Sequence, residues 1–312
     1  MSFNAWILAG ATASGKSAVS QIIAERMGAV IISADSMLVY KGMDIGTAKP
    51  SLIERGNVAY YGIDLVTPAQ CFSTGAWINA AQDALQTIHN EPIIVTGGTG
   101  LYIKALTAGL ETAEIDPQRR SHWEMVYQRS GIDALLQELK KALPNKSLNN
   151  IDQTNPRRII RALLHLEQSG RLPENWEQNP KPQIIALTME RSLLHQRIKQ
   201  RVQQMFSMGL IEETRQLKDQ YPLWSPTAME AIGYREALGV LEGTLNTEQA
   251  QERICARTRQ LAKRQETWLR HQFSTIWCVV TENDSLESVA EKVLNFWHEY
   301  GKNEIKINNN NA

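Results

Sequence analysis

The chain has 312 residues, of which 43% are hydrophobic, so it is long enough to bury a sizeable core as one large domain or two small ones. Basic and acidic residues both number 33, and this zero net charge argues against a protein that binds its partners through overall positive charge. Three widely spaced cysteines offer no disulfide framework and no apolar run reaches the roughly 20 residues of a membrane span, so we expect a soluble cytoplasmic protein without a signal peptide.

The first hundred residues alternate between strand and helix patterns. Short apolar runs predict buried strands at Ala5–Gly10, Ala29–Asp35 and Glu91–Gly97. Apolar residues at helical spacing predict helices at Lys16–Met27 and Ala76–Ile88, and a further helix begins near Leu101. Strands that alternate with helices in this way predict an α/β fold, a parallel sheet flanked by helices like that of the P-loop NTPases.

The later part of the chain is mostly helical in pattern. Residues 116–143 are polar and charged, and we expect them to form a small helical insertion between residues 1–115 and 144–300 of the core. Within the second core part we expect a helix at Pro156–Gly170, strands at Gln183–Met189 and Ile276–Asp284, and helices between these strands. The Asn-rich tail, residues 301–312, is predicted to be disordered.

The sequence GATASGKS fits the phosphate-loop pattern G-x-x-x-x-G-K-[S/T] between a predicted strand and a predicted helix. Backbone N–H groups and the helix dipole would therefore converge on an anion, Lys16 would reach its terminal phosphate, and Ser17 would bind Mg²⁺. The alternative is a chance match in a turn rich in glycine and serine. The predicted phosphate-binding residues are Gly10, Ala11, Thr12, Ala13, Ser14, Gly15, Lys16 and Ser17.

An acidic residue follows the second predicted strand and not the third. The third strand, in PIIVTGG, lacks the acid that helps hold the metal in motor and switch NTPases. Asp35 instead ends the second strand, and ligands of open parallel sheets bind at the carboxyl ends of the strands. Asp35 could act there as a general base or contact Mg²⁺ through water, although a lone aspartate at this place can also cap a helix.

Two further features are weaker signals. The GGTG turn, Gly97–Gly100, would bring backbone close to a ligand and present the Thr99 hydroxyl, but a tight turn explains it equally well. Basic residues cluster in two helical segments, where they could contact nucleic-acid phosphates or simply face solvent. These residues are Arg157, Arg158, Arg161, Arg253, Arg257, Arg259, Lys263, Arg264 and Arg270.

Taken together, these stretches resemble the tRNA dimethylallyltransferases, the isopentenyl-pyrophosphate:tRNA transferases. Beside the phosphate loop, the matching stretches include ISADSMLVYKGMDIGTAKP, VTGGTGLYIKAL, DPQRR, RRIIRAL, IGYREAL and TRQLAKRQETWLR, in the family's order over nearly the whole chain. The resemblance implies transfer of a dimethylallyl group from dimethylallyl pyrophosphate to N6 of adenosine 37 of tRNA, with release of pyrophosphate. The loop would then hold a prenyl pyrophosphate and not ATP.

Residue roles follow from the same resemblance. It implies that Asp35 is the general base, that Lys16, Ser17 and the loop hold pyrophosphate and Mg²⁺, and that Thr99 lies near the reacting nucleotide. It further implies that Arg215 contacts the pyrophosphate. The residues implied to contact tRNA are Asp35, Ser36, Met37, Leu38, Thr99, Arg120, Arg157, Arg158, Ile159, Ile160, Arg161, Glu230, Ala231, Ile232, Gly233, Tyr234 and Arg235.

The chain also departs from the family's pattern. Ala11 stands where the family often has proline, Met37 and Leu38 where many members have Arg-Gln, and Tyr60 and Tyr61 where a His-His pair is common. Base recognition at these positions is therefore in question. We expect a monomer without an obligate protein partner and without membrane contact.

Three other functions remain open at this stage. A non-catalytic nucleic-acid-binding protein would explain the basic helices but not the phosphate loop. An adenylate isopentenyltransferase would prenylate free AMP, ADP or ATP, but it would need neither the helical insertion nor the basic helices. A P-loop kinase for a small molecule would explain the loop, Ser17 and Asp35, but not the segment YKGMDIGTAKP.

Overall fold

The computed structural model of the protein describes residues 3–109, 116–143, 148, 151–172 and 181–306. Contacts divide the chain into two units, one of residues 1–109 with 181–312 and the other of residues 110–180. We describe each unit by itself. In the described part of the chain, no helix is long and apolar enough to cross a membrane.

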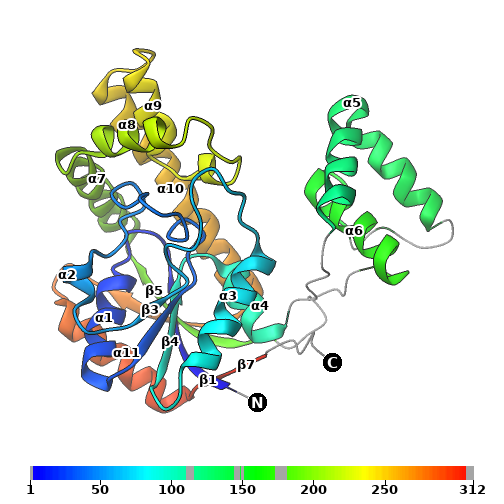
Figure 1. The fold of residues 1–312 in the computed structure, drawn as a ribbon. Coiled ribbons are helices and arrows are strands. Elements are labelled where there is room, and N and C mark those ends of the chain that lie inside the picture. Colours follow the sequence, from blue (N-terminus) through cyan, green and yellow to red (C-terminus); the bar gives the residue numbers. More distant parts are fainter. Residues whose placement is uncertain (1–2, 110–115, 144–147, 149–150, 173–180, 307–312) are drawn as a thin grey trace. The chain divides into compact units, whose positions relative to one another are not determined.

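The first unit is built on a mostly parallel sheet, which confirms the predicted α/β fold class (Figure 1). The strand order is β3-β2-β4-β1-β5-β6, and only β7 runs antiparallel, alongside β1. The central strands are continuous apolar runs, as expected where helices cover both faces of a sheet. The strands are β1 (Phe3–Gly10), β2 (Val30–Ser33), β3 (Tyr60–Tyr61), β4 (Ile93–Gly97), β5 (Gln183–Met189), β6 (Ser274–Val280) and β7 (Asn303–Ile305).

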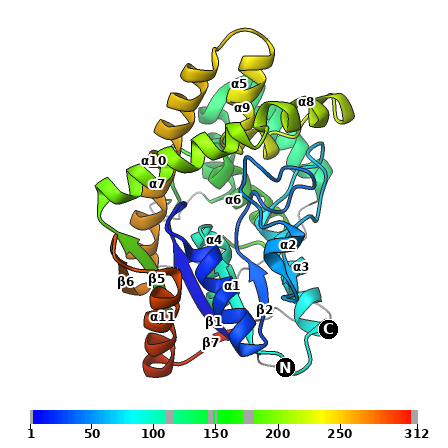
Figure 2. The same ribbon diagram turned by 90° about the vertical axis from the view of Figure 1, so that its left-hand side faces the viewer.

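Helices cover both faces of this sheet. Helices α1 (Lys16–Met27) and α11 (Leu286–Tyr300) pack together on one face, which is turned toward the viewer in Figure 2. Helices α3 (Thr74–Thr87) and α4 (Gly100–Ala108) pack together on the opposite face. The central strands of the sheet are thus buried between two helical layers.

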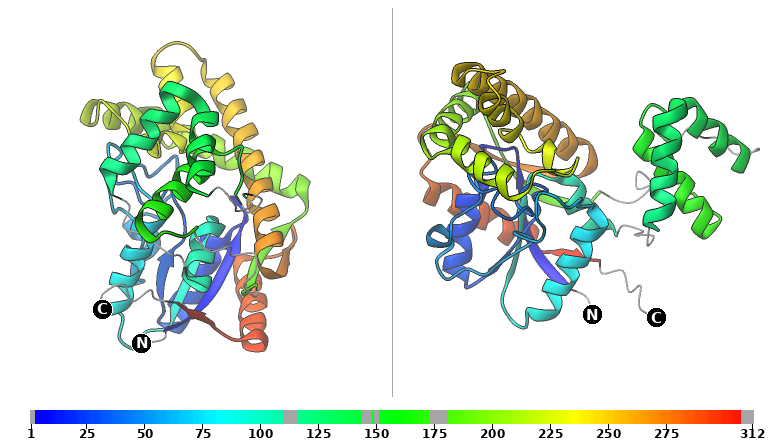
Figure 3. Two further views of the ribbon diagram at one scale, coloured as in Figure 1. Left: turned by 90° about the vertical axis from the view of Figure 1, so that its right-hand side faces the viewer. Right: turned by 45° about the horizontal axis from the view of Figure 1, so that its top comes forward.

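A group of helices lies beyond the carboxyl ends of the strands (Figure 1). It contains α7 (Arg191–Ser207), α8 (Leu210–Gln220) and α9 (Tyr234–Leu241). The same unit also contains two short helices, α2 (Leu52–Arg55) and η2 (Ala228–Glu230). The long helix α10 (Thr247–Gln272) starts in this group and runs back along the sheet, where it contacts β1, β6 and α4 (Figure 3). One helix therefore links the helical group to the sheet.

The second unit is a helical pair with a core of its own. Helix α5 (Pro117–Ala142) is bent at Gly131, whose φ of 74° lies in the left-handed region that glycine adopts without strain. Helix α6 (Pro156–Ser169) packs against it. Asp116 and Asn155 cap the two helices, each followed by proline in the first turn. The buried residues that join them are Trp123, Leu135, Leu139, Leu143, Leu148, Ile159, Ile160, Ala162, Leu163 and Leu164.

The structure differs from the predicted organisation at three places. Helix α6 belongs with α5 and not with the sheet, because its apolar face is buried in the core of the second unit. Residues 303–305, predicted to lie in a disordered tail, form β7 beside β1, whereas 307–312 lie outside the described residues. Helix α11 was not predicted, although its segment carries apolar residues at helical spacing.

Candidate active site at the carboxyl edge of the sheet

The phosphate loop connects the central strand β1 to α1, as predicted. Ala13 and Gly15 adopt positive φ values of 64° and 93°, and a hydrogen bond of 3.2 Å from Ser14 N to Ala11 O closes the turn. No side chain caps α1 and its first turn carries no acidic residue. The N–H groups of that turn have no acceptor within the helix, so the loop and the helix dipole together favour an anion.

Lys16 is buried at the start of α1 and Ser17 is exposed beside it. Burial lowers the pKa of Lys16 from 10.5 to about 8; the Asp35 carboxylate opposes this shift and the Arg201 guanidinium adds to it. The Lys16 ammonium makes one long hydrogen bond of 3.4 Å, to Ala11 O. The loop therefore holds a poorly compensated cation, which a bound phosphate would neutralise.

Asp35 follows β2 at the same edge of the sheet. Ser33 pairs with Thr96 of β4, and Ala34 N donates to Thr96 O at 2.7 Å, so the end of β2 is fixed against β4. One carboxylate oxygen of Asp35 accepts a hydrogen bond of 2.9 Å from Met37 N, which orients the side chain. Its charge acts on the pKa of Lys16, so the structure brings the predicted base and the predicted phosphate ligand together.

Thr99 lies against the segment that carries Asp35. Its backbone N–H donates to Ala34 O at 3.0 Å, and its hydroxyl accepts from Ser36 N at 3.0 Å. A Cβ at Gly97 would overlap Ala34 O, so the first glycine of the turn is needed for this close approach. The three loops that follow β1, β2 and β4 thus meet at one edge, where Thr99 contacts the residues on either side of Asp35.

Arg201 is one residue of this site that the sequence analysis missed. It lies on α7, donates to Thr47 O at 3.1 Å, and its burial lowers the pKa of the guanidinium, a shift that the Asp35 carboxylate opposes. Arg215, predicted to contact the pyrophosphate, lies on α8 with an exposed side chain paired to Glu212. The sequence does contain one signal for Arg201, because α7 directly follows β5, whose carboxyl end lies at the same edge as the phosphate loop.

The segment 40–50 is fixed by side chains of α8 and α9. The Glu213 carboxylate accepts hydrogen bonds from Asp44 N and Ile45 N and from the buried Tyr234 hydroxyl, the last at 2.6 Å. Gly46 N donates to the same hydroxyl at 3.2 Å, and a Cβ at Gly46 would overlap the Tyr234 ring. Tyr234, predicted to contact tRNA, therefore has its side chain inside the protein.

A buried lysine near the end of the segment 40–50 helps to fix its conformation. The Lys49 side chain is 2% exposed and its ammonium contacts the carboxylates of Asp44, at 2.7 Å, and Asp64. It also donates to Tyr40 O at 2.7 Å. Lys49 is thus a structural cation whose charge is satisfied, in contrast to Lys16.

The positions that depart from the family's pattern are also placed. Leu38 is buried and Met37 is partly buried, so the Leu38 side chain is not open to a base. Tyr60 and Tyr61 form β3 at the edge of the sheet, and the Tyr60 hydroxyl donates to Gln21 of α1 at 2.7 Å. Burial raises the pKa of Tyr60 to about 12.

The residues implied to contact tRNA divide by exposure. In the second unit, Arg157 and Arg158 are exposed, Arg120 is exposed and paired with Glu124, and Arg161 is partly buried. The side chains of Ile159, Ile160, Ala231 and Tyr234 are buried in the cores of their units. In the first unit, Glu230 and Arg235 are exposed, Ser36 and Ile232 are partly buried, and Gly233 begins α9 in a left-handed conformation.

Helix α10 presents only part of its basic residues to solvent. Arg253, Lys263 and Arg264 are exposed. Arg257 is instead paired at 2.6 Å with the buried carboxylate of Glu236, and Arg270 lies over the Trp277 ring at 5.7 Å. Arg270 is exposed as well, so four cations of α10 are open to contact with a nucleic-acid backbone.

Within the described residues, no cluster of three or more His, Cys, Asp or Glu side chains could hold a metal ion by itself. The Ser17 hydroxyl and the Asp35 carboxylate are oxygen ligands of the kind that Mg²⁺ accepts together with phosphate oxygens and water. The residues present therefore fit a Mg²⁺ ion that arrives with a phosphorylated ligand.

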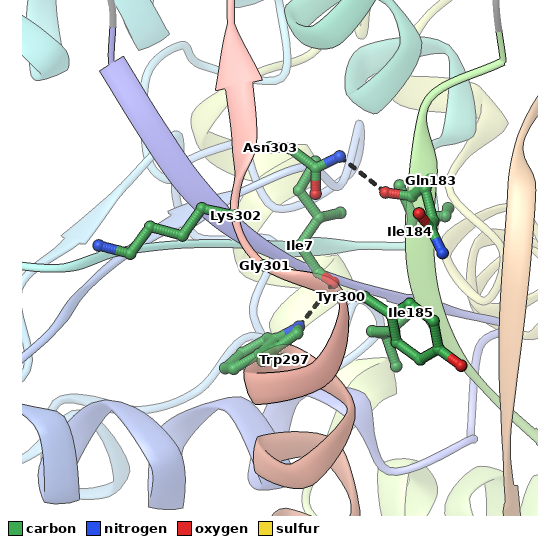
Figure 4. Close-up of a pocket in the computed structure, with 9 residues that line it drawn as sticks. All are labelled: Ile7, Gln183, Ile184, Ile185, Trp297, Tyr300, Gly301, Lys302 and Asn303. Carbon is green, nitrogen blue, oxygen red and sulfur yellow. Dashed lines mark hydrogen bonds between the residues drawn. The ribbon is translucent and has the colours of Figure 1, made fainter.

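A cavity of about 110 Å³ lies elsewhere, near the amino end of β5 (Figure 4). It is lined by Ile7, Gln183, Ile184, Ile185, Trp297, Tyr300, Gly301, Lys302 and Asn303. Figure 4 shows the Asn303 amide bonded to Gln183 O, a contact of 2.7 Å that ties β7 to β5. None of the predicted site residues lines this cavity.

The chain is similar to known proteins over most of its length. The IPP transferase family model matches residues 38–272. A tRNA dimethylallyltransferase of Sinorhizobium medicae is 38% identical over 301 residues, covering 92% of this chain and 97% of the relative. Another, of Pelotomaculum thermopropionicum, is 35% identical, covering 92% of this chain and 94% of the relative.

Solved structures show the same fold. The tRNA isopentenylpyrophosphate transferase of Bacillus halodurans superposes with a TM-score of 0.68 at 34% identity, covering 94% of this chain and 95% of that one. A eukaryotic dimethylallyltransferase, captured acting on tRNA, reaches a TM-score of 0.77 at 24% identity, covering 97% of this chain and 81% of that one. With a matching family model over most of its length and relatives above 30% identity, the chain belongs to the IPP transferase family of enzymes.

Proposed function

We propose that the protein transfers a dimethylallyl group from dimethylallyl pyrophosphate to N6 of adenosine 37 in tRNA and releases pyrophosphate. The observation that carries the proposal is the gathering of Lys16, Asp35 and Arg201 at the mouth of an anion-binding loop. Relatives and solved structures named for this activity cover nearly the whole chain. The proposed reaction needs one site for an anionic leaving group and one for a proton, and these three residues supply both.

The phosphate loop and two cations would hold the pyrophosphate. An anion bound there would be stabilised by the backbone N–H groups at the start of α1, by the Lys16 ammonium and by the Arg201 guanidinium. Charge grows on the leaving oxygen as its bond to the prenyl carbon breaks. Cations and dipoles already in place stabilise that charge without rearrangement, which is where the loop would contribute to the rate.

Asp35 would serve as the base. The N6 amine forms a bond to the first carbon of the prenyl group, the bond from that carbon to the pyrophosphate oxygen breaks, and the surplus proton of N6 passes to the Asp35 carboxylate. The hydrogen bonds from Met37 N to Asp35 and from Ser36 N to Thr99 fix this segment. Thr99 would thereby set the place of the base relative to the nucleotide.

Mg²⁺ is proposed as the cofactor, held by Ser17 together with pyrophosphate oxygens and, through water, by Asp35. When bound, it would neutralise part of the pyrophosphate charge. The protein residues would orient the ion and the pyrophosphate, and the loop would bind the prenyl pyrophosphate where related loops bind ATP.

The tRNA would be held largely by exposed basic residues. Arg157 and Arg158 in the second unit, and Arg253, Lys263 and Arg264 on α10, are exposed in their own units. N6 of a stacked adenine lies out of reach of a site at a sheet edge, so the enzyme would turn adenosine 37 out of the anticodon loop. Because its substrate is tRNA, the enzyme is proposed to act in the cytoplasm. It is also proposed to be a monomer without an obligate protein partner.

One incubation tests the proposal. The purified protein is mixed with Mg²⁺ and dimethylallyl pyrophosphate, and with unmodified tRNA, AMP or buffer; a further tube contains ATP alone. Nuclease digestion and mass spectrometry should detect N6-prenyl-adenosine from tRNA only, and a tRNA with guanosine at position 37 should give none. Product from AMP only would instead indicate an adenylate isopentenyltransferase. ADP formed from ATP would indicate a kinase.

A further inference from the structure

A glutamine of α10 connects two of the three loops of the site. The Gln265 side-chain oxygen accepts a hydrogen bond of 2.8 Å from the backbone N–H of Thr12, across 253 residues of sequence. Thr12 lies within the phosphate loop, where N–H groups would otherwise point toward the bound anion. The Thr12 N–H therefore serves to tether the loop to α10.

The same side chain packs on the glycine turn after β4. A Cβ at Gly98 would overlap the Gln265 amide nitrogen, and one at Gly100 would overlap the ring of Trp268, one helical turn further along α10. The sequence left open whether these glycines bring backbone close to a ligand or only form a tight turn. The structure shows that two of them admit side chains of α10, while Thr99 between them is bonded to the segment of Asp35.

We propose that Gln265 is a positioning residue for pyrophosphate, which holds the phosphate loop in its binding conformation and against the turn that carries Thr99. This inference rests on the proposed function, because it concerns the same loop. Gln265 itself touches no reacting atom. Its amide lies where the loop, the glycine turn and α10 meet, so losing it would loosen the first two together.

Loss of the Gln265 acceptor should weaken the binding of pyrophosphate and not that of tRNA. Gln265→Met keeps the length and most of the volume of the side chain but removes the acceptor, and leaves the Thr12 N–H without its partner. One such hydrogen bond changes an equilibrium by about tenfold. We expect the dissociation constant of inorganic pyrophosphate with Mg²⁺, and the KM for dimethylallyl pyrophosphate, to rise about tenfold. The kcat at saturating donor and the affinity for tRNA should stay within about threefold.

A double-mutant cycle adds a second measurement. Gly98→Ala should weaken pyrophosphate binding in the wild type, because its Cβ would displace the Gln265 amide. In a Gln265→Ala background the added Cβ meets Gly10 O at 3.4 Å, an ordinary contact, so the same change should cost much less there. Gln86→Met, an exposed glutamine on α3, is the matched control and should leave pyrophosphate binding unchanged.

Calorimetry with pyrophosphate and Mg²⁺, filter binding of tRNA and steady-state kinetics provide the readouts. A wild-type protein that makes no prenylated tRNA would remove the proposed function. A wild type that does, with Gln265→Met binding pyrophosphate within twofold of it, would overturn the inference alone. Equal losses of pyrophosphate and tRNA affinity would also overturn it, since they would indicate general loss of structure. Additive effects of Gly98→Ala and Gln265→Ala would overturn it too, since they would show that the two residues act independently.

Discussion

The buried charge of Lys16 should destabilise the folded protein when no ligand is bound, although the same residue is proposed to bind the pyrophosphate. Burial holds its pKa near 8 in the folded chain, compared with a usual value of 10.5 that applies when the chain unfolds. Between these two pH values the unfolded chain binds the proton and the folded chain does not, so this contribution to stability improves as pH rises. The two pKa values differ by about 2.5, which corresponds to a cost of about 3 kcal/mol below pH 8.

Lys16→Met removes this buried charge and keeps a side chain of similar length. We expect the free energy of unfolding of the ligand-free protein to rise by up to about 3 kcal/mol at pH 7, while pyrophosphate binding is lost. Above pH 8 the advantage over wild type should shrink by about 1.4 kcal/mol per pH unit, because wild-type Lys16 is then already neutral when folded.

Urea unfolding of wild type and variant at pH 7, 8.5 and 9.5, without pyrophosphate, measures the difference. Lys41→Met, at an exposed lysine, is the control and should give a difference that does not change with pH. If Lys16→Met is no more stable at pH 7, or if its difference from wild type is constant with pH, then Asp35 compensates the charge fully and the reasoning fails.

Three further predictions concern roles within the site. Asp35→Ala should lower turnover at least a hundredfold and leave tRNA affinity within about twofold, and near-normal turnover would remove Asp35 as the base. Arg201→Ala should raise the donor KM or lower turnover by at least about tenfold, whereas Arg215→Ala, at an exposed pair, should change neither by more than about threefold; the reverse ranking in steady-state kinetics would contradict the structure. Arg157→Ala and Arg158→Ala should each reduce the slope of log Kd for tRNA against log salt by about one, and an unchanged slope would mean that they face solvent in the complex.

The parts predicted well from the sequence depend on local pattern. The strand, loop and helix around Gly10–Ser17 and the acid after β2 each follow from a few neighbouring residues. Strand order then brings them together, because parallel strands place their carboxyl ends at one edge. Arg201 was missed because its proximity to Asp35 depends on how α7 packs over the sheet, which no local pattern encodes. Arg215, which the resemblance implied, lies on α8 with an exposed side chain paired to Glu212.

Burial was the second property that the sequence did not reveal. Leu38 and Tyr234 lie in stretches implied to contact tRNA, yet both side chains are buried. A motif match assigns a role to every residue it covers, whereas a helix or loop presents only one side to a ligand. Arg257 shows the same limit for charge, because its pairing with Glu236 is formed between α10 and α9 and leaves fewer cations on the surface than the sequence suggests.

The long segment 40–50 illustrates why the site needs more of the chain than the phosphate loop. Its ends and middle are fixed by Lys49, Glu213 and Tyr234, and from that fixed position Thr47 O accepts the hydrogen bond of Arg201 at 3.1 Å. A guanidinium withdrawn from water needs protein acceptors to fix its orientation, and Thr47 O is one of them. The loop alone could bind a phosphate. The segment 40–50, held by α8 and α9, supplies the acceptor that orients the Arg201 guanidinium, whose pKa is coupled to the charge of Asp35.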